Sequence, residues 1–128
     1  MAKLGEHEMN NRRTTGNAGE ALAVRHLRAA GYTIIATGWR CGLGEIDIIA
    51  HENADWVFVE VRSRFDSEPG AALESIGKRK QTKLVRLAQA YLNDHRLNNV
   101  AWRIDVVGVT FSRHQPALVE IIVNAVGW

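Results

Sequence analysis

Apolar and polar residues alternate along two neighbouring segments near the middle of the chain, Glu45–His51 and Trp56–Arg62. A period of two is typical of β-strands, because successive strand side chains point to opposite faces of the sheet. The short polar connection between the two segments, residues 52–55, predicts a hairpin. The same criteria predict three more strands, over residues 32–36, 100–109 and 117–123. A glycine-containing loop is predicted over residues 38–44.

Two helices are predicted beside these strands. The first begins near Asn17, because Asn17 and Glu20 have the spacing of a capping box, and it ends before Gly31. The second covers Lys78 to about His95, after an irregular segment over residues 63–76. Its apolar side, defined by spacings of three and four residues, consists of Leu84, Leu87, Ala88, Tyr91 and Leu92. The order α, β, β, β, α, β, β predicts an α/β protein with a mixed sheet flanked by helices.

Composition and length favour one globular domain. The chain has 128 residues, of which 46% are hydrophobic. A chain of this length can bury a hydrophobic core without disulfides or structural metals. Residues 1–13 are polar and lack periodicity, so we expect a flexible tail followed by a single domain over residues 14–128. The single cysteine, Cys41, excludes a disulfide framework within one chain. Without a long apolar run or an apolar signal core, we expect a cytoplasmic protein that has no membrane partner.

The alternation places acidic residues on both strands of the hairpin. A loop of two or of four residues gives the same register, in which Asp47 lies opposite Glu60 and Glu45 lies opposite Arg62. Opposed side chains have Cβ atoms about 4.5–5.5 Å apart, so the two carboxylates repel each other unless a cation or a proton lies between them. A hard divalent cation with oxygen ligands meets this need. The structural alternative is that Glu60 pairs with an arginine and Asp47 caps a loop.

The same alternation assigns the faces of the first hairpin strand. One face is expected to carry Glu45, Asp47 and Ile49, and the other Ile46, Ile48 and Ala50. On the second strand, Phe58 and Glu60 are expected on one face and Val57 and Val59 on the other.

The stretch GEIDIIA, followed by a short turn and VFVEVR, resembles the core motif of the PD-(D/E)XK, or restriction-endonuclease-like, nuclease superfamily. More narrowly, the chain is similar to the YraN-like family of predicted endonucleases over about residues 16–110. The similar stretches also include GNAGEALAVRHLRAAGY and WRIDVVGV. This resemblance implies a restriction-endonuclease-like mixed sheet flanked by helices. It also implies a nuclease that depends on Mg²⁺ or Mn²⁺ and acts on nucleic acid, with DNA as the expected substrate.

The resemblance assigns roles to four residues of the hairpin. Asp47 and Glu60 match the two metal-binding acids, and the Val61 carbonyl is a candidate third ligand. Arg62 stands in the place of the motif lysine. Arginine can stabilise phosphate charge, but its pKa is too high for a general base.

Three further acids each allow two interpretations. Glu20, on the first helix, matches an acid that often reaches the catalytic site, and a capping role explains it equally well. Glu45 is either a second metal ligand or, slightly favoured, the ion-pair partner of Arg62. Asp105 is expected to form a structural ion pair, with Arg103 or with a helix base, rather than to take part in catalysis.

The first half of the second helix contains five basic residues and no acidic residue over residues 78–86. The basic residues are Lys78, Arg79, Lys80, Lys83 and Arg86. A basic first turn opposes the helix dipole, which is easier to understand if an anion binds there. Arg79, Lys83 and Arg86 form one stripe by their spacing. We expect this stripe to contact nucleic-acid phosphates, the alternative being a solvated helix face. Lys80 is a candidate substitute for the motif lysine.

The leading hypothesis is a metal-dependent nuclease or nuclease-like protein. A catalytically inactive nucleic-acid-binding module with the same fold is the main alternative, and a protein-interaction scaffold is a third. DNA and RNA, in duplex, branched and single-stranded forms, are the substrates to compare, in the presence of Mg²⁺ or Mn²⁺.

Overall fold

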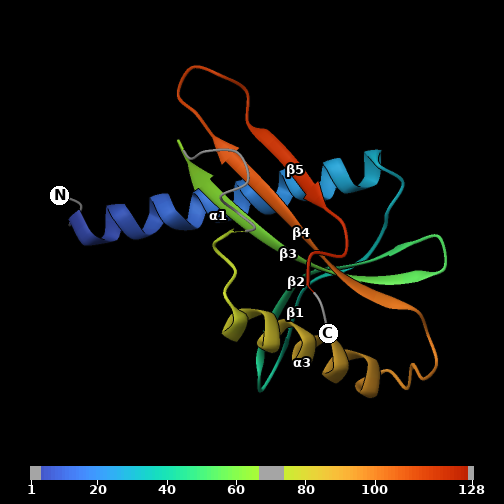
Figure 1. Ribbon diagram of the computed structural model, residues 1–128. Coiled ribbons are helices and arrows are strands. Elements are labelled where there is room, and N and C mark those ends of the chain that lie inside the picture. Colours follow the sequence, from blue (N-terminus) through green and yellow to red (C-terminus); the bar gives the residue numbers. More distant parts are fainter. Residues whose placement is uncertain (1–3, 67–73, 127–128) are drawn as a thin grey trace.

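The computed structural model describes residues 4–66 and 74–126, with side chains described from residue 16 onward. Its elements are, in chain order, α1 (Leu4–Ala29), β1 (Thr33–Cys41), β2 (Gly44–Glu52), β3 (Asp55–Phe65), α3 (Lys78–Asp94), β4 (Trp102–Phe111) and β5 (Leu118–Ile122). They form a mixed α/β fold in which α1 and α3 lie on opposite sides of one sheet (Figure 1). Within the described ranges, no helix combines the length and hydrophobicity needed to cross a membrane.

The sheet has five strands in the order β1-β2-β3-β4-β5. Neighbouring strands are antiparallel except β3 and β4, which are parallel. Parallel neighbours need a crossover connection, and the segment that contains α3 provides it.

Each face of the sheet is covered by one helix. On the α1 side, Ala23 and Leu27 pack in one buried cluster with sheet residues such as Val57. On the α3 side, Leu87 packs with sheet residues such as Phe58 in a second buried cluster. The sheet is therefore buried on both faces, and this accounts for its largely apolar central strands.

Two sequence-based predictions are confirmed in detail. The helix predicted from Lys78 is α3, and its five predicted apolar residues are all buried. The β2–β3 hairpin has the predicted register, with Glu52 opposite Asp55 and His51 opposite Trp56. Phe58 packs on the α3 side, whereas Val57 and Val59 pack on the α1 side, as the alternation on the second strand predicted.

Several predicted boundaries were wrong. The first helix begins at Leu4 rather than near Asn17, and residues 4–13 of the expected tail belong to it; residues 1–3 lie outside the described residues. Most of the glycine-containing loop is strand, because β1 stays paired with β2 until Cys41 opposite Gly44. The irregular segment predicted over residues 63–76 begins too early, because β3 continues to Phe65, and residues 67–73 lie outside the described residues.

The face assignment of β2 was wrong at one position. Ile48 and Ala50 share a face as predicted, and it is the α1 side, but Ile46 packs on the α3 side together with Ile49. The alternation therefore breaks at Asp47, which lies between the two stretches. This break coincides with the place where β2 separates from β3.

Candidate functional site

β2 and β3 separate where the two acidic positions of the hairpin begin. Their last paired residues are Ile48 and Val59. Beyond this pair, β2 remains paired with β1, and β3 remains paired with β4 as far as Phe65. Asp47 lies at the start of the gap, and its Oδ2 accepts a 2.8 Å hydrogen bond from the backbone N–H of Val61. The carboxylate thus replaces the strand carbonyl that would otherwise accept this N–H.

Four carboxylates come together at this gap, and we call them the acid group: Glu20, Glu45, Asp47 and Glu60. Carboxylate oxygens of Glu20, Glu45 and Asp47 lie within 4.8 Å of one another. Glu60 is buried, with 6% of its surface exposed, and its charge acts directly on Asp47. α1 contributes Glu20 from one side of the sheet, so the acid group draws on three elements of the fold.

Burial and the charge of neighbouring carboxylates raise the pKa values of two members of the acid group, Asp47 and Glu20. Burial raises the pKa of Asp47 to about 7, and the charge of Glu60 adds to this effect, whereas the Val61 N–H opposes it. Burial also raises the pKa of Glu20, helped by the charge of Glu45. Several carboxylates at such short range favour a proton or a cation between them. Oxygen donors of this kind, half-buried and mutually close, fit a hard divalent cation.

Two cations share the carboxylate of Glu60. The Nζ of Lys80, on α3, lies 3.2 Å from Glu60 Oε2, and the Nε of Arg62 lies 3.5 Å from the same oxygen. Arg62 Nε is buried, and among the described residues it has no hydrogen-bond partner. The positive charge at this end of the gap therefore exceeds what Glu60 alone neutralises.

Two of the ion-pair and capping assignments from the sequence were wrong. Glu45 pairs with Arg40, at 3.2 Å, and not with Arg62. The reason is the register of β1 and β2, which places Arg40 opposite Glu45, while β3 has already turned away. Glu20 cannot cap its helix, because α1 begins at Leu4, and its side chain instead joins the acid group.

Gly19 is a positioning residue that the sequence analysis missed. It is buried against β3, and a Cβ added at this position would collide with the Oγ and crowd the Cβ of Ser63. The missing side chain lets α1 approach the sheet closely, which brings the next residue, Glu20, to the acid group. A glycine inside a helix costs about 1 kcal/mol relative to alanine, and this cost was the available signal.

Asp105 belongs to a separate buried network and has the structural role expected of it. Its Oδ1 accepts hydrogen bonds from Arg103 Nε at 3.0 Å and from the backbone N–H of Asn124 at 2.8 Å. Its Oδ2 accepts one from the Tyr32 hydroxyl at 2.6 Å. A carboxylate with this many partners is satisfied and needs no ligand.

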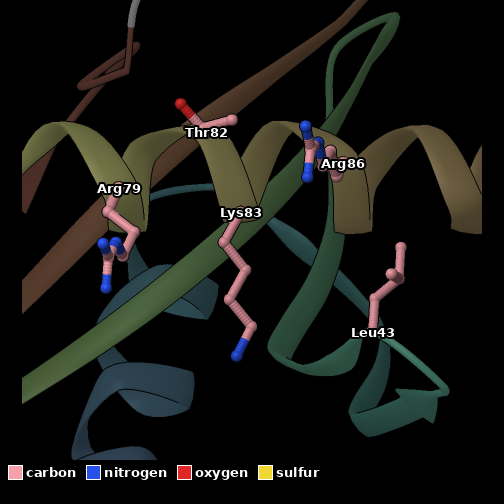
Figure 2. Close-up of a pocket in the computed structure, with 5 residues that line it drawn as sticks. All are labelled: Leu43, Arg79, Thr82, Lys83 and Arg86. Atoms are coloured by element: carbon pink, nitrogen blue, oxygen red, sulfur yellow. The ribbon is translucent and has the colours of Figure 1, made fainter.

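The basic stripe of α3 lines a pocket of about 550 Å³ against the β1–β2 turn (Figure 2). We call this the basic pocket, and its lining residues are Leu43, Arg79, Thr82, Lys83 and Arg86. Lys83 lies over Gly44, where a Cβ would come within 3.0 Å of the lysine Cε. Of the other two predicted phosphate-binding residues, Lys78 is exposed and Lys80 contacts Glu60.

The family model and the similar sequences point to one family. The chain matches the model described as "Uncharacterised protein family UPF0102" over residues 19–109. A UPF0102 protein of Roseiflexus castenholzii is 47% identical over 121 residues, covering 92% of this chain and 98% of that protein. A UPF0102 protein of Herpetosiphon aurantiacus is 42% identical over 113 residues, covering 85% and 91%.

Among solved structures, the chain is similar to one described as the structure of Pyrococcus furiosus SfsA in complex with Ca²⁺. The TM-score is 0.37 at 15% sequence identity, over 91% of this chain and 65% of that chain.

Proposed function

The chain belongs to the uncharacterised protein family UPF0102, and we propose that it is a divalent-metal-dependent nuclease of the PD-(D/E)XK kind. Its substrates would be nucleic-acid phosphodiesters, with DNA expected first. The observation that carries this proposal is the acid group in the gap between β2 and β3, with two cations beside it. Close carboxylates next to half-buried positive charge are suited to binding a metal ion and a phosphate together.

The acid group has the donors that Mg²⁺ or Mn²⁺ requires. Glu20, Glu45 and Asp47 would hold the ion, with Glu60 next to Asp47 as a further ligand. The Val61 carbonyl is an additional donor, because the N–H and C=O of an extended residue project to the same edge of a strand, and the Val61 N–H faces Asp47. When bound, such an ion activates water and offsets the negative charge that develops on the phosphate.

The two cations near Glu60 have complementary roles in this proposal. Arg62 provides a guanidinium that can bind phosphate oxygens in a bidentate manner. Lys80 brings an ammonium group from α3 to within 3.2 Å of Glu60, although the strand position of the motif lysine is occupied by arginine. Lys80 would orient the attacking water or stabilise developing charge in place of the motif lysine.

A cleavage assay tests the proposal. Labelled DNA and RNA, in single-stranded, duplex and branched forms, are incubated with the protein in Mg²⁺, in Mn²⁺ and in EDTA. Asp47→Asn should reduce metal-dependent cleavage by more than about 100-fold, because losing even an outer partner of a metal ligand costs about 10–100-fold. Asp94→Asn, which changes an exposed aspartate of α3, should cleave normally. Equal cleavage by Asp47→Asn, or full cleavage in EDTA, would contradict the proposal.

A catalytically inactive nucleic-acid-binding module is the second candidate function. The arginine at position 62 favours it, because a guanidinium cannot act as a general base at ordinary pH. The basic pocket would then be the functional surface. Salt-dependent binding of nucleic acid without cleavage in Mg²⁺ or Mn²⁺ selects this candidate over the nuclease.

A further inference from the structure

The basic pocket contains an apolar residue that neither the fold nor phosphate binding requires. Leu43 belongs to the two-residue turn between β1 and β2, and 52% of its surface is exposed. Neither residue of this turn has a positive φ, so a leucine is tolerated there, yet Leu43 belongs to neither of the two buried clusters of the fold. Leu43 instead presents a branched apolar side chain beside the cations of α3 (Figure 2).

The walls and the rim of the basic pocket differ in chemistry. Arginine and lysine have apolar stems and charged ends, so Arg79, Lys83 and Arg86 form apolar walls with positive charges at their tips. Leu43 adds a further apolar wall, and no described residue lining the pocket is acidic. A volume of about 550 Å³ lies within the range of sites for small organic groups.

These features together match one nucleotide of a nucleic-acid strand. A base is flat and apolar on its faces, and proteins bind unpaired bases by packing side chains against those faces. The phosphates on either side of the base carry the negative charge that the pocket rim complements. A simple row of phosphates would need the three cations but would gain nothing from Leu43.

We propose that the basic pocket receives the base of an unpaired nucleotide, so that the protein binds single-stranded or locally unpaired nucleic acid in preference to continuous duplex. In a duplex, a base must first leave its stack and its partner, which lowers the net affinity for the pocket. This inference rests on the proposed function, because it takes nucleic acid as the ligand.

The position of the pocket relative to the acid group supports this use. Lys83 lies over Gly44, the residue directly before Glu45 of the acid group. Lys80 contacts Glu60 and lies three residues earlier on α3, about 4.5 Å along the helix axis. The sugar-phosphate backbone of a nucleic-acid strand with one base in the pocket would therefore pass close to the acid group.

Binding measurements on the intact protein test the inference. Fluorescence anisotropy in EDTA compares a labelled single strand, the same sequence as a blunt duplex, and that duplex with one bulged nucleotide. We expect the single strand and the bulged duplex to bind at least about fivefold more tightly than the blunt duplex. Leu43→Ala should abolish this difference and leave the salt dependence unchanged, because no charge is removed.

Leu118→Ala is the matched control. Leu118 is a leucine of similar exposure, 46%, on the edge strand β5. This variant should keep the preference for unpaired nucleotides, and thermal melts should show both variants folded. If the native protein binds blunt duplex as tightly as single strand, or if Leu43→Ala keeps the preference, the inference fails and the proposed function stands. If neither form binds, the inference fails, and the cleavage assay in Mg²⁺ and Mn²⁺ decides the proposed function separately.

Discussion

Acidic side chains gather at both ends of the β2–β3 hairpin, but their charges are compensated in different ways. At the turn end, Arg103 pairs with Glu52 at 2.7 Å, with Asp55 at 2.8 Å and with Asp105 at 3.0 Å. At the other end, the strands separate, and Asp47 accepts one backbone hydrogen bond among three other carboxylates.

This difference separates structural acids from functional candidates. A buried carboxylate whose oxygens are all satisfied stabilises the protein as part of a network, and removing a partner is costly. A group of carboxylates in which burial and neighbouring charges raise the pKa of some members, here Asp47 and Glu20, is a candidate functional site. The number of acids at the two ends is similar, so the arrangement of their partners makes the distinction.

The largest expected effect tests the turn end. Arg103→Met leaves Asp105 buried without its main cation, and we expect it to lower the free energy of unfolding by about 3–5 kcal/mol. Urea unfolding monitored by tryptophan fluorescence measures the change. The control is Arg40→Met, which removes an arginine with an 80% exposed side chain and should cost less than about 1 kcal/mol. If both variants lowered the free energy of unfolding equally, the Arg103 network would contribute no more to stability than the surface pair of Arg40, which would contradict the comparison.

The next effect concerns the close approach of α1 to the sheet. Gly19→Val places a side chain against Ser63 and should lower stability by about 1–3 kcal/mol, as overpacking does elsewhere. It should also weaken Mn²⁺ binding, measured by calorimetry, because Glu20 would be displaced from the acid group. Gly16→Val is the matched control on the same helix, since nothing lies within 4 Å of a Cβ at that position. If the two variants bind Mn²⁺ equally well, Gly19 does not position Glu20.

A smaller effect with a defined pH dependence is expected at Asp47. Its pKa is raised in the folded protein, so the unfolded chain loses the proton first, and the contribution of Asp47 to stability falls as pH rises from about 4 to about 7. Asp47→Asn removes this penalty and keeps an oxygen for the Val61 N–H. In metal-free buffer at pH 8, the variant should therefore be more stable than the native protein by about 1–2 kcal/mol.

Thermal and urea unfolding in EDTA, at several pH values from 5 to 8, measure this difference. The stability advantage of Asp47→Asn should be small at pH 5 and should grow towards pH 8. A variant less stable than the native protein at pH 8 would mean that Asp47 is satisfied like Asp105, and the contrast between the two ends would disappear.

The smallest expected change is that of Arg62→Lys. Lysine keeps the positive charge beside Glu60 and is the residue that the proposed nuclease motif would have at this position, so cleavage should be kept or raised and the melting temperature nearly unchanged. Arg62→Ala should abolish cleavage while sparing Mn²⁺ binding, which rests on the acid group. A stable Arg62→Ala protein with undiminished metal-dependent cleavage would remove Arg62 from the proposed site.

Local patterns in the sequence determined much of this picture. The turn length set the register of β2 and β3, because a short loop permits few pairings. The period of two placed Phe58 and Glu60 on the same face, and their partners on β4, Ile104 and Val106, both pack on the α3 side. Helical spacing identified α3 and its buried side. These predictions succeeded because they depend on residues that are near one another in the chain.

Only the tertiary structure decided how the site is assembled. The pairing of β2 with β3 ends at Ile48 and Val59 because, beyond this point, β2 stays paired with β1 and β3 stays paired with β4. The pairing of β2 with β1 also places Arg40 beside Glu45 as its ion-pair partner. The meeting of Lys80 with Glu60 depends in turn on how α3 packs across the sheet. These contacts join residues far apart in the chain, whose relative positions follow from burying both faces of the sheet and not from local periodicity.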